Sequence, residues 1–545
     1  MNRIPLFLFF AVSILSTPAR AQSYNPVIDV QHYGFSLLLN DANNSIRGKA
    51  DITVLFREGA EKFSLDLVKK KTTGKGMQVS SVKEGNTALR FGQDSGTLQI
   101  FTGAAAGRST TGKTAIAGSI HTYTIVYEGI PADGLIIGPN KYGHRGFFGD
   151  NWPNRAHNWL PCVDHPSDKA TVDFIISAPD HYQVVANGSK EEEKALPNHY
   201  RLTHWKESVP LSPKVMVIGV AGFAIDHPGD VQGIPIYNYV FPENKEQGFK
   251  SYSVATQILP FYMEKIGPYP FEKEGNVQSR TRFGGLENAS AIFYFENSVT
   301  APGIESLMAH EIAHQWFGDA ATETQWQHLW LSEGFATYMT LCYLENKYGQ
   351  DSLKKGMAKD REKVFSFEKK RLTSIVDTTI KSDYMQLLNP NSYEKGGWVL
   401  HMLRRRLGDT VFWKGISTYY ASYRNRNADS EDFEKVMEDV SGQDLKSFFH
   451  QWLNTAGHPH IQIDWKYDND KKELVIDFRQ AVGSFRQTSI PVFEFSLEYA
   501  VDGVLHRVEI QDANFQVRLP LPEKPVTLVP DPNVNLLASF EVRNL

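Results

Sequence analysis

The spacing of apolar residues changes twice along this chain of 545 residues, and the two changes limit the folds open to it. From residue 24 to residue 225, short runs rich in β-branched and aromatic residues, such as ATVDFIISAP, are separated by Gly, Asn and Pro, which is typical of strands. From residue 226 the apolar residues recur at helical spacing, as in SYSVATQILPFYMEKIG, and several such segments end at Gly. After NTAGHP the strand pattern returns. The sequence therefore predicts a multidomain α+β protein.

These changes in pattern divide the chain into four segments. We expect a signal peptide at residues 1–21, an N-terminal antiparallel β-sandwich or open barrel at 22–225, a mostly helical domain at 226–456 and a small C-terminal β-sandwich at 457–545. A chain of this length, with 41% hydrophobic residues, can bury more than one core. The segment after NTAGHP is too short and too strand-like for a large helical superhelix.

The first 21 residues have the pattern of a signal peptide. Arg3 supplies a short positive region, the stretch from Ile4 to Leu15 is mostly apolar, and ARA at residues 19–21 fits the small-x-small cleavage rule. The apolar run is too short to cross a bilayer, which takes about 20 residues. We therefore expect cleavage, export to the periplasm or the extracellular space, and no stable insertion in a membrane.

Charge and cysteine content exclude two further classes. The net charge is −5, so nothing in the composition indicates a nucleic-acid partner. Cys162 and Cys342 are the only cysteines in the sequence, and a single pair is no disulfide framework. Because Cys342 lies in an apolar stretch, YMTLCYLENKYG, we expect two buried free thiols. The sequence does not indicate an oligomeric state.

The stretch LMAHEIAHQWFGD carries the clearest chemical pattern in the chain. His310 and His314 are four residues apart, so they lie on one face of a helix, one turn from each other. Glu311 points about 100° away from His310. Two imidazoles on one face can hold a metal ion, with a carboxylate beside it, and zinc is the metal usually bound by this pattern. Two core histidines in an ordinary helix would give the same spacing.

A catalytic zinc ion usually has three protein ligands. A third histidine at the spacing of the metzincin pattern is absent, because that position holds Ala320. Glu333, in HLWLSEGFATYM, is the alternative, and 18 residues separate it from His314, enough for a turn and the start of a second helix. Its neighbours are apolar, so an unpaired charge there would be costly and a metal would offset that cost. We therefore predict Glu333 as the third ligand.

The stretches HEIAHQWFGD and WLSEGFATY together resemble the signature of peptidase family M1, the zinc aminopeptidases. RFGGLENASAIFY resembles the exopeptidase motif of that family, with Leu286 where Met is usual. NSYEKGGWVLHML resembles the segment that carries its catalytic tyrosine, and WLPCVDHPSDKATVDF resembles part of its N-terminal domain. The resemblance implies a thermolysin-like catalytic domain that uses zinc and water to remove the N-terminal residue of peptides.

The resemblance also implies roles for individual residues. His310, His314 and Glu333 would hold one Zn²⁺ ion. Glu311 would take a proton from water and pass it to the leaving amine. Tyr393 would donate a hydrogen bond to the oxyanion that forms during attack.

The segment GGLEN would recognise the substrate. Glu287 would bind the free α-ammonium, because an internal amide would leave this carboxylate unpaired. Gly284 and Gly285 would let the backbone approach closely. Leu286 and Asn288 belong to the same segment, which in the family is an edge strand that pairs with the peptide.

One position departs from the family pattern. Trp152 stands where the family usually has a second amine-binding Gln or Glu, and Asp150 and Asn151 are near enough in sequence to replace it. Two other classes remain open. A thermolysin-like endopeptidase would share the metal site, although GGLEN argues against it. A non-catalytic peptide-binding protein would be expected to have lost a ligand, the base or the tyrosine, and none of these is lost.

Overall fold

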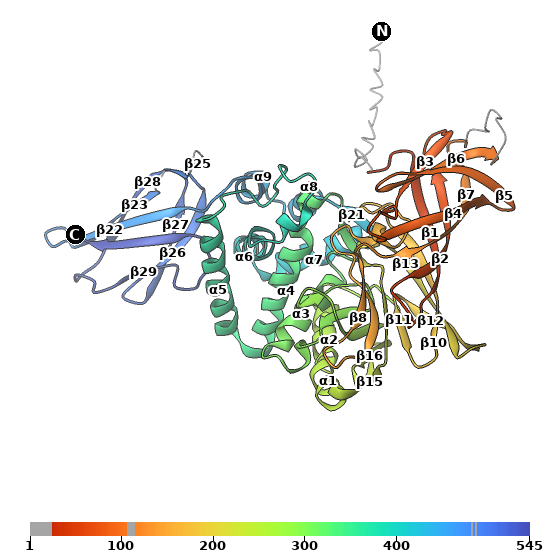
Figure 1. Ribbon diagram of the computed structural model, residues 1–545. Helices are drawn as coiled ribbons and strands as arrows, with labels where there is room; N and C mark the ends of the chain where they lie inside the picture. Colours follow the sequence, from red (N-terminus) through yellow and green to blue (C-terminus); the bar gives the residue numbers. More distant parts are fainter. Residues whose placement is uncertain (1–23, 106–114, 481–482, 486–487) are drawn as a thin grey trace, which may run out of the picture.

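The computed structural model describes residues 24–105, 115–480, 483–485 and 488–545. The predicted signal peptide lies outside these residues. Strands at the N-terminal end, helices in the middle and strands at the C-terminal end follow one another in a line (Figure 1). The predicted multidomain α+β fold is therefore confirmed. No helix among the described residues is both long enough and apolar enough to cross a membrane.

The largest element of the N-terminal part is a ten-stranded sheet, and along strands such as β10 fully buried side chains alternate with half-buried ones. In spatial order its strands are β12 (Ser189–Leu196), β13 (Tyr200–Leu211), β10 (Ala170–Pro179), β1 (Ile28–Leu38), β2 (Ile46–Phe56), β7 (Ile120–Ile130), β4 (Gly76–Glu84), β5 (Thr87–Gln93), β6 (Thr97–Ala105) and β3 (Lys62–Asp66). Neighbouring strands are antiparallel except β1 and β10, which are parallel. This pair departs from the expected antiparallel arrangement. A long stretch of chain separates the two strands, so β10 can enter from the same end as β1.

A second, antiparallel sheet completes the N-terminal part. Its strands, in order, are β11 (Gln183–Ala186), β14 (Ile218–Ala221), β9 (Arg145–Gly149) and β8 (Leu135–Pro139). Side chains of both sheets, among them Phe147 and Phe174, join one buried cluster. The two sheets together thus form the predicted sandwich.

A five-stranded mixed sheet lies between the N-terminal part and the helices. Its order is β15 (Ala224–Val231), β16 (Ile234–Val240), β17 (Glu274–Ser279), β19 (Ile292–Phe295) and β18 (Gly285–Leu286). The strand β18 is antiparallel to β19 and lies at the edge of the sheet. GGLEN therefore lies at an open sheet edge, where a peptide can add a strand. The expected boundary at residue 225 falls inside β15, because that strand belongs to this sheet.

Nine α-helices are present in the described part of the chain. They are α1 (Lys245–Tyr252), α2 (Ala255–Lys265), α3 (Ile304–His314), α4 (Trp330–Tyr348), α5 (Gln350–Glu368), α6 (Gly396–Leu407), α7 (Asp409–Tyr423), α8 (Ser430–Ser441) and α9 (Lys446–Phe449). Helix α4 packs against α3, α5 and α6. A short parallel pair, β20 (Ala321–Glu323) and β21 (Arg426–Ala428), lies beside them.

Helix α3 is shorter than the apolar pattern suggested. It ends at His314, and the residues after it form turns, with the Asp319 amide donating to the His314 carbonyl at 3.1 Å. Gly318, with φ of +119°, lies in these turns. The chain can therefore reverse after the second histidine and return toward α4.

Two sheets form the C-terminal part. One has the order β28 (Asn514–Pro520), β23 (Glu473–Gln480), β22 (His460–Asp468) and β30 (Ser539–Asn544); the other has β27 (Val504–Ile510), β26 (Phe495–Val501) and β29 (Leu528–Pro530). A hairpin, β24 (Gly483–Phe485) and β25 (Thr488–Ile490), extends from them. The rings of Phe478 and Tyr499 pack 5.8 Å apart between the sheets, which gives the predicted small sandwich a core.

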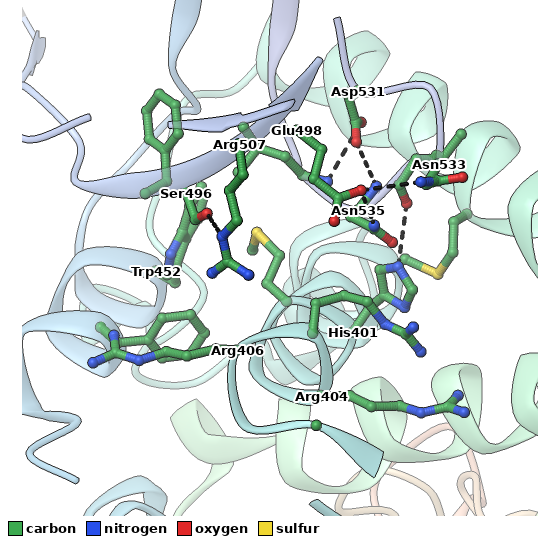
Figure 2. A pocket seen from close by; sticks show the side chains of 18 of the residues that line it. His401, Arg404, Arg406, Trp452, Ser496, Glu498, Arg507, Asp531, Asn533 and Asn535 are labelled. Atoms are coloured by element: carbon green, nitrogen blue, oxygen red, sulfur yellow. Dashed lines mark hydrogen bonds between the residues drawn. The ribbon is translucent and has the colours of Figure 1, made fainter. Parts of the chain in front are cut away.

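The C-terminal sandwich docks on helices α5 and α6 around a cavity of about 720 Å³ (Figure 2). His401 of α6 contacts the Val534 carbonyl at 3.2 Å, and from α5 Lys354 donates to Asn533 at 2.9 Å and Arg361 donates to Asp531 at 3.2 Å. These contacts join the sandwich to the helices. Both cysteines are buried and free, as predicted.

Candidate active site and metal centre

Three predicted metal ligands converge from two helices. His310 and His314 come from α3, and Glu333 comes from the first turn of α4, which packs against α3. The Nε2 atoms of the two histidines are 3.1 Å apart. Glu333 Oε2 lies 3.2 Å from His314 Nε2 and 3.4 Å from His310 Nε2. Helical spacing and one interhelical contact thus bring the three ligand atoms together.

These distances fit a zinc ion. Zinc bonds of about 2.0–2.2 Å in a tetrahedron place neighbouring ligand atoms about 3.3 Å apart. The buried Glu333 Oε2 contacts the Nε2 atoms of both histidines, so the three ligand atoms surround one point. The cavity around it, about 280 Å³ in volume, has Glu287, Glu311 and Glu333 in its wall, and no Lys or Arg is among its described lining residues. A divalent cation would supply the positive charge that this group lacks.

His314 is oriented by contacts on its far side. Its Nδ1 lies 3.1 Å from the Phe317 carbonyl and 3.0 Å from Ser332 Oγ. A proton on Nδ1 would be donated to the carbonyl and would leave Nε2 free to bind metal. Burial opposes a charge on His314, but the Glu333 carboxylate outweighs it and raises the pKa of the imidazole to about 10.

Glu311 lies directly against the substrate-binding segment. A Cβ atom at residue 285 would lie 2.2 Å from Glu311 Oε1, so any larger residue there would displace the Glu311 carboxylate. At Gly284 the same added atom would meet only Leu307, at 3.8 Å, so that glycine is not required sterically. Burial raises the pKa of the Glu311 carboxyl well above its usual range, and Glu287 and Glu333 raise it further. This carboxyl therefore holds a proton more readily than a carboxyl in water.

Tyr393 reaches the same site from a single π-helical turn, Asn391–Lys395, immediately before α6. Its ring is stacked on His310 with centroids 6.0 Å apart. Burial raises the pKa of its hydroxyl well above 10, and the nearby Glu333 carboxylate adds to the effect. Gly334 and Gly396 let α4 and α6 approach so closely that a Cβ on either would meet backbone at 2.9–3.0 Å. Because its pKa is raised, the Tyr393 hydroxyl stays protonated and can donate a hydrogen bond beside the predicted metal ligands.

Glu287 lies in the wall of the same cavity, 4% exposed. Its Oε1 atom has no hydrogen-bond partner within the described part of the chain. Its backbone carbonyl accepts a hydrogen bond from Gln315 at 3.0 Å, which ties the segment to the end of α3. Asn288 is buried but lies outside the cavity wall, unlike the other nine predicted site residues.

The sequence matches two domains of one peptidase family. The match to the Peptidase M1 N-terminal domain covers residues 29–213, and the match to the Peptidase family M1 domain covers residues 250–452. The chain belongs to peptidase family M1. Both matches stop before the C-terminal sandwich begins at β22.

Several curated proteins are similar to this M1 family member. Glutamyl aminopeptidase of Rattus norvegicus is 24% identical over 345 residues, which are 61% of this chain and 36% of the relative. Probable aminopeptidase 2 of Sulfurisphaera tokodaii is 28% identical over 325 residues, 56% of this chain and 41% of the relative. The matches thus span well under half of each relative.

A solved structure has the same fold. The crystal structure of M1 zinc metallopeptidase from Deinococcus radiodurans has a TM-score of 0.66 to this chain at 23% identity. The alignment covers 79% of this chain and 94% of that one.

The departure at Trp152 has a structural consequence in this M1 family member. Trp152 lies in the cavity wall, 2% exposed. Asp150 pairs with Arg155 and accepts from the Arg282 amide, whereas the Asn151 amide group donates to Pro213 and Met216. Neither of these two residues lines the cavity. Because both side chains are held by these contacts outside the cavity, neither Asp150 nor Asn151 replaces the second amine-binding group.

Sequence reasoning missed the residues that hold the site residues in place. Gln315 directly follows His314, and Ser332 directly precedes Glu333. This adjacency to predicted metal ligands was the one signal in the sequence that could have identified them. Lys214 and Glu323 form a fully buried ion pair of 2.6 Å between the N-terminal part and β20. No local pattern indicated this pair, because the two residues are 109 positions apart.

Proposed function

We propose that this chain is a zinc-dependent aminopeptidase that removes the N-terminal residue of peptides. One observation carries the proposal: a cavity that holds three ligand atoms 3.1–3.4 Å apart also contains the buried, unpartnered carboxylate of Glu287. The first group can bind a metal that acts on a peptide bond. The second can bind a free ammonium at a fixed distance from it.

His310, His314 and Glu333 would hold the zinc. When bound, zinc supplies a Lewis acid that polarises the scissile carbonyl and makes water more acidic. Glu311 accepts the proton of the attacking water on its carboxylate and later gives it to the departing amine.

Tyr393 donates its hydroxyl proton in a hydrogen bond to the oxygen of the tetrahedral intermediate. The π-helical turn and the stacking on His310 hold the hydroxyl in position, so little reorganisation accompanies the reaction.

Glu287 makes the activity an exopeptidase activity. An α-ammonium would supply the hydrogen bonds that Glu287 Oε1 lacks, whereas an internal amide or an acetylated amine would leave it buried and unpaired. The edge position of β18 supports pairing of its backbone with an extended substrate. The alternatives of an endopeptidase and of a non-catalytic peptide-binding protein account for fewer of these features.

We also propose that the protein works outside the cytoplasm, in the periplasm or the extracellular space. The support is the pattern at residues 1–21, a short positive region, an apolar run and a small-x-small site. N-terminal sequencing of the protein from its native host tests this, with a start at Gln22 expected.

The activity is tested with leucine p-nitroanilide and its N-acetyl derivative, using zinc-loaded protein. We expect rapid release of nitroaniline from the free amine, little from the acetylated one, and loss of activity with a chelator that added zinc reverses. Equal hydrolysis of both substrates would favour the endopeptidase. Hydrolysis of neither would favour the binding protein.

A further inference from the structure

The cavity of the candidate active site has one wall that the proposed chemistry does not use. The metal ligands, Glu311 and Tyr393 account for one side, and the segment from Gly284 to Glu287 accounts for another. The remaining lining residues are Trp152, Phe283, Leu307 and Leu388, and the side chain of Leu286 is also apolar. They come from separate parts of the chain, yet none of them carries a charge.

The side chain of a substrate's first residue must face this wall. Its ammonium is fixed at Glu287, and its carbonyl carbon must lie beside Glu311 and Tyr393. Since both neighbours of the first α-carbon are fixed in this way, the side chain on that carbon can point only toward the remaining lining. The character of this apolar wall therefore decides which N-terminal residues fit.

An acidic side chain would be excluded. No Lys or Arg is among the cavity's described lining residues, and three carboxylates are already present there. Three cations close to this wall in sequence or in space are paired elsewhere: Arg155 with Asp150, Lys214 with Glu323 and Arg282 with Asp133. A further carboxylate would be desolvated with no cation among the described lining residues to balance its charge.

Trp152 is the largest member of the wall and is held in place. Its ring packs edge-on against Phe283 at 6.2 Å and against Trp326 at 6.0 Å, and Trp326 stacks on Tyr384 at 5.1 Å. The backbone carbonyl of Trp152 accepts a hydrogen bond from Arg155 Nε at 2.8 Å. A buried ring packed against two other rings cannot move away to admit a larger side chain at low cost.

We propose that the site selects apolar N-terminal residues of moderate size, and that Trp152 sets the upper limit of that size. This inference rests on the proposed aminopeptidase function. It differs from the acidic preference that the name glutamyl aminopeptidase states for the relatives. The indole supplies the contact that stabilises a leucine-sized side chain and occupies the space that an aromatic one would need.

The test measures kcat/KM of the zinc-loaded enzyme for the p-nitroanilides of leucine, alanine, phenylalanine and glutamate. We expect leucine to exceed alanine by about 10-fold and glutamate by about 100-fold or more, which is the usual range for apolar pockets and for unpaired charges. Trp152→Ala should raise the ratio of phenylalanine to leucine by about 10-fold. Trp152→Phe should raise the phenylalanine-to-leucine ratio by a smaller factor. This variant provides the measurement if Trp152→Ala does not fold.

Trp413→Ala is the matched control, because Trp413 is a tryptophan of α7 outside this cavity. Its ratios should equal those of the wild type. Glutamate cleaved as fast as leucine, or an unchanged phenylalanine-to-leucine ratio in both Trp152 variants, would overturn the proposal while leaving the aminopeptidase function intact. If none of the four substrates is hydrolysed, the result would instead contradict the proposed aminopeptidase function.

Discussion

Two buried groups of charged side chains lie on either side of the turn that carries Tyr393, and they differ in how they are paired. The ligand cluster consists of Glu287, His310, Glu311, His314 and Glu333. The anchor cluster consists of Glu368, Lys395 and His458. In the ligand cluster, Glu287 Oε1 lacks a hydrogen-bond partner among the described residues, and Glu333 Oε2 contacts two histidines that are themselves predicted metal ligands. In the anchor cluster every member has a partner.

The pairing of the anchor cluster is complete. Lys395 Nζ donates to Glu368 Oε1 at 2.9 Å and to the Gly457 carbonyl at 2.7 Å, and His458 Nδ1 contacts the other oxygen of Glu368. Burial alone would raise the pKa of Glu368, but Lys395 and His458 outweigh it and lower that pKa to about 2. In contrast, burial raises the pKa of Glu311. Paired charges fix the turn, whereas unpaired ones are left for a ligand.

Changes in the ligand cluster should therefore affect turnover more than stability, and changes in the anchor cluster should do the reverse. Glu311→Gln should lower kcat by about 10²–10⁴-fold, because the proton acceptor is lost. Zinc content should stay at one per chain, and the unfolding temperature should not fall, since an amide is less costly to bury than a carboxylate.

Steady-state kinetics, metal analysis and thermal unfolding of the same preparation check this prediction. Glu305→Gln is the control, because Glu305 is on the same helix but pairs with Lys347 away from the cavity. Wild-type turnover in the zinc-loaded Glu311 variant would show that another group accepts the proton.

Tyr393→Phe should lower kcat by about 10²–10³-fold with little change in KM, the effect of removing one oxyanion donor. The ring and its stacking on His310 are kept, so stability should change little. Tyr384→Phe, which removes a hydroxyl that donates to the Lys381 carbonyl, should leave kcat unchanged. An increase in KM at unchanged kcat would make Tyr393 a binding residue.

The sequence indicated these clusters to different degrees. His310, Glu311 and His314 follow from local spacing, and the order of strands, helices and strands follows from local periodicity. The anchor cluster was not predicted, since its three residues lie far apart in sequence and each is an ordinary polar residue in its own segment. The parallel pairing of β1 with β10 was missed for the same reason: the pattern within a strand does not specify its partner.

The surroundings of Trp152 are a second feature that could not be predicted from the sequence. Counting from Cys162 identified the missing amide or carboxylate, but it left Asp150 and Asn151 as replacements. Their hydrogen bonds to Arg155, Pro213 and Met216 involve residues up to 65 positions away, and no local pattern encodes those contacts.

Glu287→Gln should narrow the preference for free over acetylated amines by about 10–100-fold, because a neutral amide attracts an ammonium less than a carboxylate does. The ratio of kcat/KM for leucine p-nitroanilide and its N-acetyl derivative measures this. Glu296→Gln is a suitable control, since Glu296 follows β19 and accepts from the Lys141 amide outside the cavity. An unchanged ratio in the Glu287 variant would place amine recognition elsewhere.

Glu368→Gln should have the smallest effect on turnover, a severalfold fall in kcat, and the largest effect on stability. It leaves the buried Lys395 ammonium without a compensating negative charge, which costs about 3 kcal/mol in free energy of unfolding. Because the folded-state pKa of Glu368 is lowered to about 2, its contribution is present above the unfolded value of 4.5 and is lost as the pH falls toward 2. The difference between wild type and variant should therefore be large at pH 7 and should shrink below about pH 4.5.

Urea unfolding of both proteins at several pH values, with equal zinc loading, measures this difference. Glu362→Gln changes an exposed carboxylate of the same helix, so its unfolding curve should match that of the wild type at every pH. A loss of stability in Glu368→Gln that does not depend on pH would mean that Glu368 acts by packing rather than by charge. The contrast between a paired anchor and an unpaired ligand cluster would then no longer explain why Tyr393 is held in place.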